Sequence, residues 1–278
     1  MIGAIIGDIV GSRFEFVEYD QRDKNFIFWG TGCRPTDDSF MTLAVAKALY
    51  LSNGDREKLK DIVIYCMRSV AHDHPNTGWG GRFYKWLFNE TNPKPYNSFG
   101  NGAGMRISPV GWVAESEEEV KELSKIVTEV SHNHPEGLKG AEAVAMAVYL
   151  ARTGKDKQEI RAKMQEYYPQ LCDKNFTIEN IYGHYGYDDL GKWVTCQGSI
   201  PQALAAFLDS TGFEDAVRNA VYIGGDSDTI GAMAGGIAEA YYGVPPELEE
   251  KALSYLTDDL KGLYYAFENI RKSRVKRP

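Results

Sequence analysis

The sequence lacks the signals that mark membrane, secreted or disulfide-stabilised proteins. No apolar run approaches the roughly 18 residues of a membrane-spanning helix, and the apolar start of the chain lacks the basic region of a signal peptide. The four cysteines show neither CxxC pairing nor the spacing of a disulfide framework. We therefore expect a cytoplasmic protein with reduced thiols, no membrane contact and no zinc bound through cysteine.

An excess of positive charge is also missing. The chain carries 31 Lys and Arg residues against 39 Asp and Glu residues, a formal net charge of −8. This balance argues against a nucleic-acid-binding surface. We expect a monomer without a nucleic-acid partner, and an anionic ligand would have to be held by metals, helix N-termini or local arginines.

Signals for β-strands are scarce, because alternation of period two is hard to find and the best strand candidate, residues 26–29, is short. Helical periodicity covers most of the chain, and no shift in composition marks a linker. We predict an all-α protein, a single domain over residues 1–278, with a long irregular segment at 169–197. Helices are predicted at 38–51, 56–71, 78–89, 117–131, 138–152, 157–167, 199–209, 213–222 and 246–271.

Two short acidic runs carry the main chemical signal. The first is Thr36-Asp37-Asp38, and the second is Asp226-Ser227-Asp228-Thr229 after two glycines. Hard oxygen ligands of this kind suit Mg²⁺, Mn²⁺ or Ca²⁺ rather than zinc. Each run could instead cap a helix N-terminus, a role that is compatible with binding a metal. If the runs converge, each like-charged pair at about 4 Å costs roughly 4 kcal/mol at an effective dielectric of 20, and divalent cations would cancel these charges.

Glycines spaced four residues apart occur in two segments, as Gly3, Gly7 and Gly11 and as Gly231 and Gly235. Residues at this spacing share one helix face, so two nearly bare faces permit unusually close helix packing. We predict that the N-terminal helix packs against a helix at 228–241 and carries Asp8 and Glu15 towards the acidic runs. The alternatives are that each stripe packs under a bulky side chain elsewhere, and that Glu15 is a surface carboxylate.

Two polar loops are further candidates for ligand binding. The glycine-rich run at 98–106 has backbone amides that could cradle a phosphate, although it lacks the Lys-Ser/Thr ending of a P-loop and could be a structural turn. The run at 131–137 contains His132 and His134. They lack a matching third zinc ligand nearby, so a loop that contacts a ligand is the better interpretation.

Taken in order, these runs resemble the ADP-ribosylglycohydrolase family, which includes arginine-specific and serine-specific ADP-ribosyl hydrolases. The resemblance spans residues 3–236. The matching runs are Gly7-Asp8-x-x-Gly11-x-x-x-Glu15, Thr36-Asp37-Asp38, Ser98-Phe99-Gly100-Asn101-Gly102, Met105-Arg106, Ser131-His132-x-His134-Pro135 and Gly224-Gly225-Asp226-x-Asp228-Thr229.

The resemblance implies an all-α orthogonal multi-helix bundle with a binuclear centre of two Mg²⁺ or Mn²⁺ ions. Its metal ligands would be Thr36, Asp37, Asp38, Asp226, Asp228 and Thr229. Glu15 would lie near the scissile bond, with Asp37 and Asp226 as further catalytic carboxylates. The substrate-binding residues would be His132, beside the bound ADP-ribose, and Phe99, Gly100, Asn101 and Gly102, near its phosphates.

The implied activity is metal-dependent hydrolysis of an N- or O-glycosidic bond between ADP-ribose and an acceptor, through an oxocarbenium-like transition state. The partner would be an ADP-ribosylated protein or a small-molecule conjugate of ADP-ribose, and arginine is favoured over serine or small molecules as the acceptor. Two alternatives remain. Because the fold also occurs in a lens crystallin, the chain could be a non-catalytic ADP-ribose-binding or structural protein, and it could also be a metal-dependent nucleotide phosphohydrolase.

Overall fold

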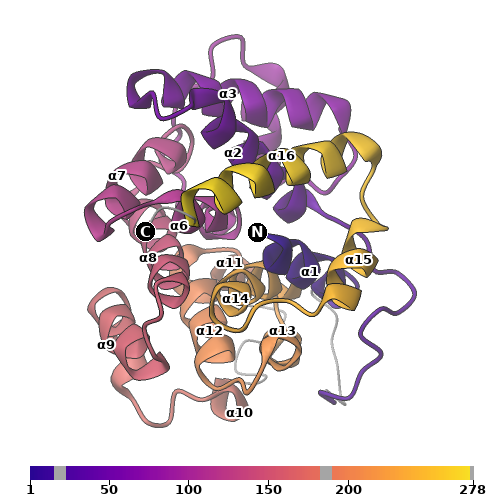
Figure 1. Cartoon of the computed structure of the whole chain (residues 1–278), viewed down its shortest axis with the longest axis vertical. Helices are drawn as coiled ribbons and strands as arrows, with labels where there is room; N and C mark the ends of the chain where they lie inside the picture. Colours follow the sequence, from indigo (N-terminus) through magenta and orange to yellow (C-terminus); the bar gives the residue numbers. More distant parts are fainter. Residues whose placement is uncertain (16–22, 182–189, 276–278) are drawn as a thin grey trace.

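Helices form nearly all of the regular structure of the chain (Figure 1). The computed structural model describes residues 1–15, 23–181 and 190–275, and these ranges contain an isolated bridge between Gly100 and Thr195 but no β-strand. The possible strand at residues 26–29 is therefore wrong. Its residues lie in turns and bends, where the rings of Phe26 and Phe28 stack with their centroids 6.4 Å apart. The predicted all-α class is confirmed.

Most predicted helices are present, with bounds close to those expected from periodicity. They are α2 (Asp37–Ser52), α3 (Arg56–Asp73), α7 (Glu117–Thr128), α8 (Pro135–Arg152), α9 (Lys157–Tyr167), α12 (Cys196–Leu208) and α13 (Phe213–Ile223). Side-chain caps account for several of the helix starts, since each capping oxygen accepts a hydrogen bond from a backbone N–H in the first turn. These caps are Thr36, Asp55, Ser116, Asp156 and Thr195.

Short helices fill most of the remaining connections. They are α4 (Gly81–Tyr84), the π-helix η1 (Lys85–Asn89), α5 (Gly102–Met105), α6 (Ser108–Val113), the 3₁₀-helix η2 (Pro169–Cys172), α10 (Ile178–Ile181) and α11 (Leu190–Trp193). The last three lie in the segment predicted to be irregular, of which residues 182–189 are outside the described part of the chain.

The single helix predicted at 246–271 is wrong, because the structure has two helices there, α15 (Pro246–Leu253) and α16 (Asp258–Val275). The acidic pair Asp258-Asp259 occupies the first turn of α16, where it interacts favourably with the helix dipole. Leu253, Leu256 and Leu260 stay buried across the turn. The apolar pattern therefore continues through the break, so periodicity alone could not reveal it.

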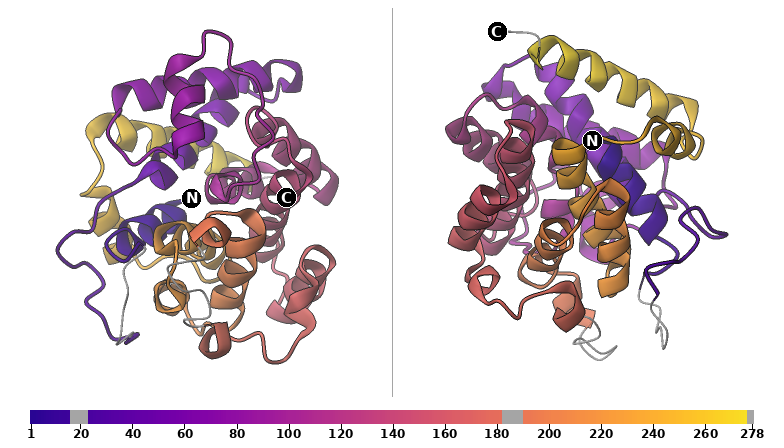
Figure 2. Two further views of the ribbon diagram at one scale, coloured as in Figure 1. Left: turned by 180° about the vertical axis from the view of Figure 1, so that it is seen from behind. Right: turned by 60° about the horizontal axis from the view of Figure 1, so that its bottom comes forward.

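The helices α1 (Ile2–Gly11) and α14 (Ser227–Tyr242) cross at the centre of the fold along their glycine faces (Figure 2). A Cβ atom added to Gly7 would lie 1.9 Å from the carbonyl oxygen of Gly231, and one added to Gly3 would lie 2.2 Å from that of Gly235. The predicted packing is confirmed. The nearest atoms are backbone atoms, so the alternative of a bulky side chain over each stripe is wrong.

We expect Gly7→Ala to destabilise the fold by about 1–3 kcal/mol or more, because the new methyl group overlaps backbone that cannot rotate away. Gly262→Ala in α16 is the matched control, since no atom lies within 4 Å of its added Cβ. This control should raise stability by roughly 0.5–1 kcal/mol, as Ala replaces Gly within a helix. Urea unfolding measures both effects, and equal stability of the two variants would contradict the close crossing.

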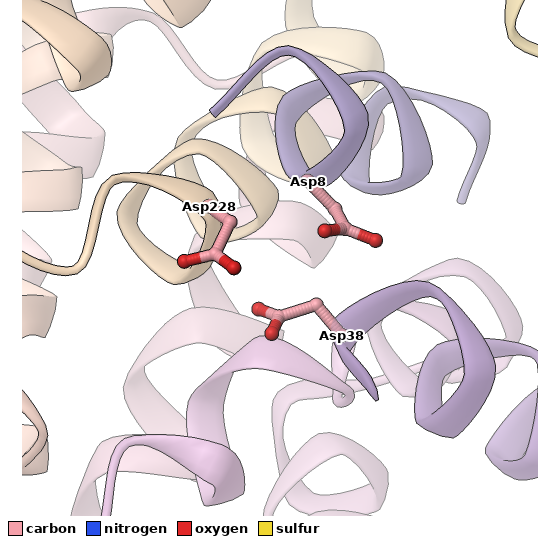
Figure 3. Close-up of side chains that lie close together, drawn as sticks. All are labelled: Asp8, Asp38 and Asp228. Carbon is pink, nitrogen blue, oxygen red and sulfur yellow. The ribbon is translucent and has the colours of Figure 1, made fainter. Parts of the chain in front are cut away.

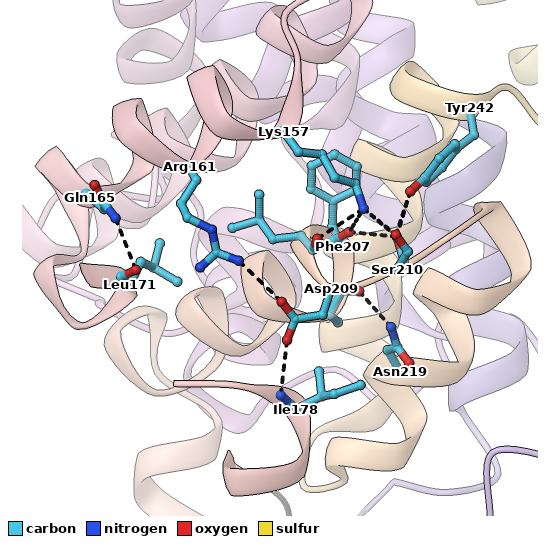
Figure 4. Close-up of polar contacts among 12 residues, drawn as sticks. Lys157, Arg161, Gln165, Leu171, Ile178, Phe207, Asp209, Ser210, Asn219 and Tyr242 are labelled. Atoms are coloured by element: carbon cyan, nitrogen blue, oxygen red, sulfur yellow. Dashed lines mark hydrogen bonds and ion pairs between the residues drawn. The ribbon is translucent and has the colours of Figure 1, made fainter. Parts of the chain in front are cut away.

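Other helices surround this central pair. Helix α14 also contacts α8, α12 and α13, whereas α2 packs against α3 and α16 at the end of the molecule that is uppermost in Figure 1. Lys157, at the start of α9, contacts the C-terminal end of α12. Its ammonium group donates hydrogen bonds to the carbonyl oxygens of Phe207 at 2.9 Å and Leu208 at 3.1 Å (Figure 4). A cation at this position also interacts favourably with the helix dipole.

Two findings concern the membrane and the thiols. None of the helices in the described ranges combines the length and apolar composition that crossing a bilayer requires. All four cysteines are free thiols, of which Cys172 is exposed and the other three are buried.

Candidate active site

The ends of several helices meet at a cavity of about 410 Å³, a volume typical of small-molecule sites. Most of the predicted site residues line this cavity, although they come from segments far apart in the sequence. They are Glu15, Asp37, Asp38, Gly100, Asn101, Gly102, His132, Asp226, Asp228 and Thr229. Two predicted residues, Thr36 and Phe99, do not line it.

Asp8 joins α1 to the start of α2. Its carboxylate accepts hydrogen bonds from Thr36 N at 2.9 Å, Thr36 Oγ1 at 2.6 Å and Ser39 N at 3.0 Å, and another from Ser39 Oγ. A carboxylate offers about four lone-pair positions for hydrogen bonds, and these donors occupy them. Asp8 lies close to Asp38 and Asp228 (Figure 3). Its hydrogen bonds nevertheless make it an anchor for α2, and they turn the Thr36 hydroxyl towards α1.

The turn before α14 directs Asp226 and Asp228 into the cavity. Gly224 and Gly225 have φ of +85° and +73°, and a Cβ on Gly225 would lie 2.2 Å from the ring of Trp193. Glycine is therefore required at Gly225. The side chain of Asp226 makes no capping hydrogen bond to α14, so the alternative that this residue simply caps the helix is wrong.

Asn101 holds Asp226 in place. Its amide nitrogen lies 2.6 Å from Asp226 Oδ2 and 3.0 Å from Ser199 Oγ. The loop that carries Asn101 is itself tied to the start of α12, because Asn101 N donates to the carbonyl oxygen of Val194 at 2.9 Å and Cys196 N donates to that of Phe99 at 2.9 Å. Asn101, predicted to contact substrate, thus uses its side-chain amide to orient a carboxylate.

The buried carboxylates disfavour one another's charge. Burial and the neighbouring aspartates raise the pKa values of Asp37, Asp38 and Asp228 well above the usual range, and burial raises the pKa of Asp226 to about 6. Within the described part of the chain, the buried Oδ1 atom of Asp38 has no hydrogen-bond partner. An unpaired carboxylate oxygen among clustered acids fits a hard divalent cation.

The acidic side chains form two candidate sets of metal ligands. Asp8, Asp38 and Asp228 form one set, and Glu15, Asp226 and Asp228 form the other. In each set, one carboxylate oxygen from every residue lies within 4.8 Å of the chosen oxygens of the other two residues. Asp228 belongs to both sets, whereas the carboxylate of Asp8 already accepts hydrogen bonds from Thr36 and Ser39.

Glu15 lies at the wall of the cavity, shortly after α1 ends at Gly11. It is half-buried, so the alternative of an exposed surface carboxylate is wrong. Burial first, and then the charge of Asp228, raise the pKa of Glu15 to about 7, while Arg34 opposes the shift. The close packing of α1 on α14 places Glu15 beside the acidic cluster, as predicted from the glycine pattern.

The opposite wall contains residues that were not predicted from the sequence. Arg82, Phe83 and Tyr96 line the cavity together with His132. They were missed because the helix predicted at 78–89 begins only at Gly81. The residues before it form a loop in which Gly78 has a φ of +91°. The glycine-rich run 78–81, which resembles the run at 100–104, was the signal that could have revealed this wall.

Two predicted features lie at the edge of the cavity or outside it. The side chain of Phe99 is 39% exposed and its ring centroid is 5.0 Å from that of His134, so it points away from the cavity. The segment 169–197, a predicted wall for the leaving group, contributes Val194 to the lining. Its residues 182–189 lie outside the described part of the chain.

Comparisons with known proteins agree on one family. The family model described as ADP-ribosylglycohydrolase matches residues 1–274. The human ADP-ribosylhydrolase ARH3 is 24% identical, over 94% of this chain and 90% of that protein. The ADP-ribosylarginine hydrolase Tri1 of Pseudomonas putida (strain GB-1) is 27% identical, over 90% of this chain and 72% of that protein. A solved structure, the "ADP-ribosylglycohydrolase-related protein complex", has the same fold, with a TM-score of 0.65, 22% identity and 97% coverage of both chains.

Proposed function

The chain belongs to the ADP-ribosylglycohydrolase family, and we propose that it is a metal-dependent hydrolase that cleaves the glycosidic bond between ADP-ribose and an acceptor. The observation that carries this proposal is the meeting of Glu15 with Asp226 and Asp228 in one cavity. His132 and the glycine-rich loop at 100–102 line the same cavity. The carboxylates proposed for catalysis therefore lie in the same cavity as the residues proposed to bind ADP-ribose.

We propose that Thr36, Asp37, Asp38, Asp226, Asp228 and Thr229 hold two Mg²⁺ or Mn²⁺ ions. When bound, such ions supply Lewis-acid stabilisation and lower the pKa of water. The chain's own groups keep the ligand set in position: Asp8 anchors α2, and Asn101 orients Asp226. The buried, unpartnered Oδ1 of Asp38 supports this assignment.

Glu15 is the proposed acid or base near the scissile bond, and Asp37 or Asp226 serves the other role. Hydrolysis requires a proton for the leaving group and a base for the attacking water. All three carboxylates line the cavity, where Glu15 and Asp37 are half-buried and Asp226 is buried. The glycines at 100 and 102 leave space beside the cavity for the phosphates of ADP-ribose.

We propose ADP-ribosylated arginine as the preferred substrate, within a protein or as a small molecule. The substituted guanidinium group of ADP-ribosylated arginine is cationic, so the carboxylate of Glu15 in the cavity lining favours it over the uncharged oxygen of serine. The similarity to a protein named ADP-ribosylarginine hydrolase supports the same choice.

Product analysis tests this function. The protein is incubated with Mg²⁺ or Mn²⁺ and, separately, with ADP-ribosylated arginine, an ADP-ribosylated serine peptide and ADP-ribose. We expect free ADP-ribose from the conjugates, released faster from arginine than from serine. AMP and ribose phosphate would indicate a nucleotide phosphohydrolase instead. Binding of ADP-ribose without turnover of any conjugate would indicate a binding protein.

A further inference from the structure

We propose that Arg106 is a positioning residue that holds His132 as a neutral imidazole with its proton on Nε2. His132 then presents an N–H donor to the cavity, and the acceptor is an oxygen of the ADP-ribose part of the substrate. The identity of this ligand rests on the function proposed above, whereas the state of the imidazole does not.

The geometry at Nδ1 of His132 carries the proposal. Arg106 Nη2 lies 2.9 Å from His132 Nδ1 and 2.9 Å from Ser131 Oγ, and Ser131 Oγ lies 2.8 Å from the same Nδ1. A guanidinium group can only donate hydrogen bonds, whereas the Ser131 hydroxyl can donate or accept. The contact between Arg106 and Nδ1 is therefore a hydrogen bond only when Nδ1 is the unprotonated acceptor. The opposite tautomer would place two N–H donors face to face. The remaining proton of a neutral ring is therefore on Nε2.

The Nε2 atom faces the glycine-rich loop of the cavity. It lies 3.4 Å from the point that a Cβ on Gly102 would occupy and 3.5 Å from the corresponding point on Gly100. Side chains at these two positions would crowd the space in front of the donor. His132 itself is only 4% exposed, so its ring cannot turn freely into solvent.

The surroundings of His132 disfavour a charged ring. Burial first, and then the positive charges of Arg106 and Arg82, hold the pKa of His132 well below its usual range. The other ionisable group against the ring is Tyr96, with centroids 5.9 Å apart, and burial raises its pKa. A neutral donor of this kind keeps the same hydrogen bond as pH changes.

Arg106 is an unusual residue to find here unless it has such a role. It is fully buried, and in the described part of the chain it forms no ion pair and its Nε and Nη1 atoms have no hydrogen-bond partner. The guanidinium carbon lies 5.1 Å from the centre of the Phe83 ring, which provides partial compensation through a cation–π contact. A buried cation without an ion-pair partner lowers the stability of the fold. We assign to Arg106 the positioning of His132, which compensates functionally for this loss of stability.

The imidazole state can be measured directly in the wild-type protein. Long-range ¹H–¹⁵N spectra of the full chain with ¹⁵N-labelled histidine distinguish protonated from unprotonated ring nitrogens, and His132→Gln assigns the signal. We expect protonated Nε2 and unprotonated Nδ1 at His132, unchanged between about pH 5 and 8, the range in which an ordinary histidine titrates. A proton on Nδ1, or a charged ring at neutral pH, would overturn the proposal.

Two variants separate Arg106 from its neighbour. Arg106→Met should abolish the fixed tautomer, because the Ser131 hydroxyl that remains beside Nδ1 can either donate or accept. It should raise the Kd for ADP-ribose about 10- to 100-fold, because the imidazole no longer presents a fixed N–H donor to the ligand. Ser131→Ala should keep the wild-type tautomer, because the guanidinium still donates to Nδ1. An Arg106→Met protein with wild-type spectrum and affinity, or loss of the tautomer in Ser131→Ala, would overturn the assignment to Arg106.

These outcomes are distinguishable from failure of the proposed function. If Arg106→Met does not fold, the wild-type and Ser131→Ala spectra still decide. If the wild-type spectrum is as expected but the protein does not bind ADP-ribose, the positioning of His132 is supported and the proposed function is contradicted.

Discussion

The Glu15→Gln variant is expected to release ADP-ribose from a conjugate with a kcat about 10²–10⁴-fold below that of the wild type. Glutamine keeps the size and polarity of the side chain but cannot give or take a proton. Glu15 lines the cavity beside Asp226 and Asp228. Steady-state kinetics measures the change in kcat, and the Kd for ADP-ribose should stay near the wild-type value.

Glu250→Gln in α15 is the matched control, since the same chemical change is made at an exposed position. It should leave kcat and affinity unchanged. If Glu15→Gln lost affinity for ADP-ribose while keeping its kcat, Glu15 would be a binding residue, and another carboxylate would have to supply the acid or base.

The second large effect is expected at Asp38. Asp38→Asn keeps the side-chain volume but removes one of the clustered buried carboxylates. Turnover should fall by about 100-fold or more, because losing a residue that only supports a metal ligand already lowers activity by about 10- to 100-fold. Mg²⁺ or Mn²⁺ should raise the Tm of the wild type by binding the folded state, and should raise that of the variant much less. Circular dichroism should show that the helices remain.

The control for this variant is Asp61→Asn on the exposed side of α3. It should keep both the turnover and the metal-dependent rise in Tm. Without added metal, Asp38→Asn should be at least as stable as the wild type, because a buried charge is removed. Wild-type turnover by Asp38→Asn at saturating Mg²⁺ would exclude Asp38 from the metal centre.

The sequence predicts the helices well because their signals are local. Side-chain caps such as Thr36 and Asp156 mark helix starts, and apolar periodicity marks the buried faces. The glycine stripes add one long-range contact, since the bare faces at Gly7 and Gly231 fit only close to one another. From that contact follows the position of Glu15 relative to Asp228.

Other parts of the site depend on contacts that no spacing rule contains. The anchoring of α2 by Asp8 joins residues on different helices, and the role of Asn101 as a support for Asp226 depends on a loop docked against α12. Most of the site residues implied by the resemblance lie in one cavity, but Thr36 and Phe99 lie outside its lining. The resemblance could not show that the ring of Phe99 points away from that cavity or that Arg106 contacts His132.

The most direct test of metal-dependent hydrolysis measures free ADP-ribose released from ADP-ribosylated arginine while Mn²⁺ is titrated into metal-free protein. We expect no release without metal. With added Mn²⁺, release should rise to saturation with the wild type and Asp61→Asn but stay at the metal-free level with Asp38→Asn. Release at the full rate in the presence of a chelator, or the same metal dependence in Asp38→Asn as in the wild type, would contradict this expectation.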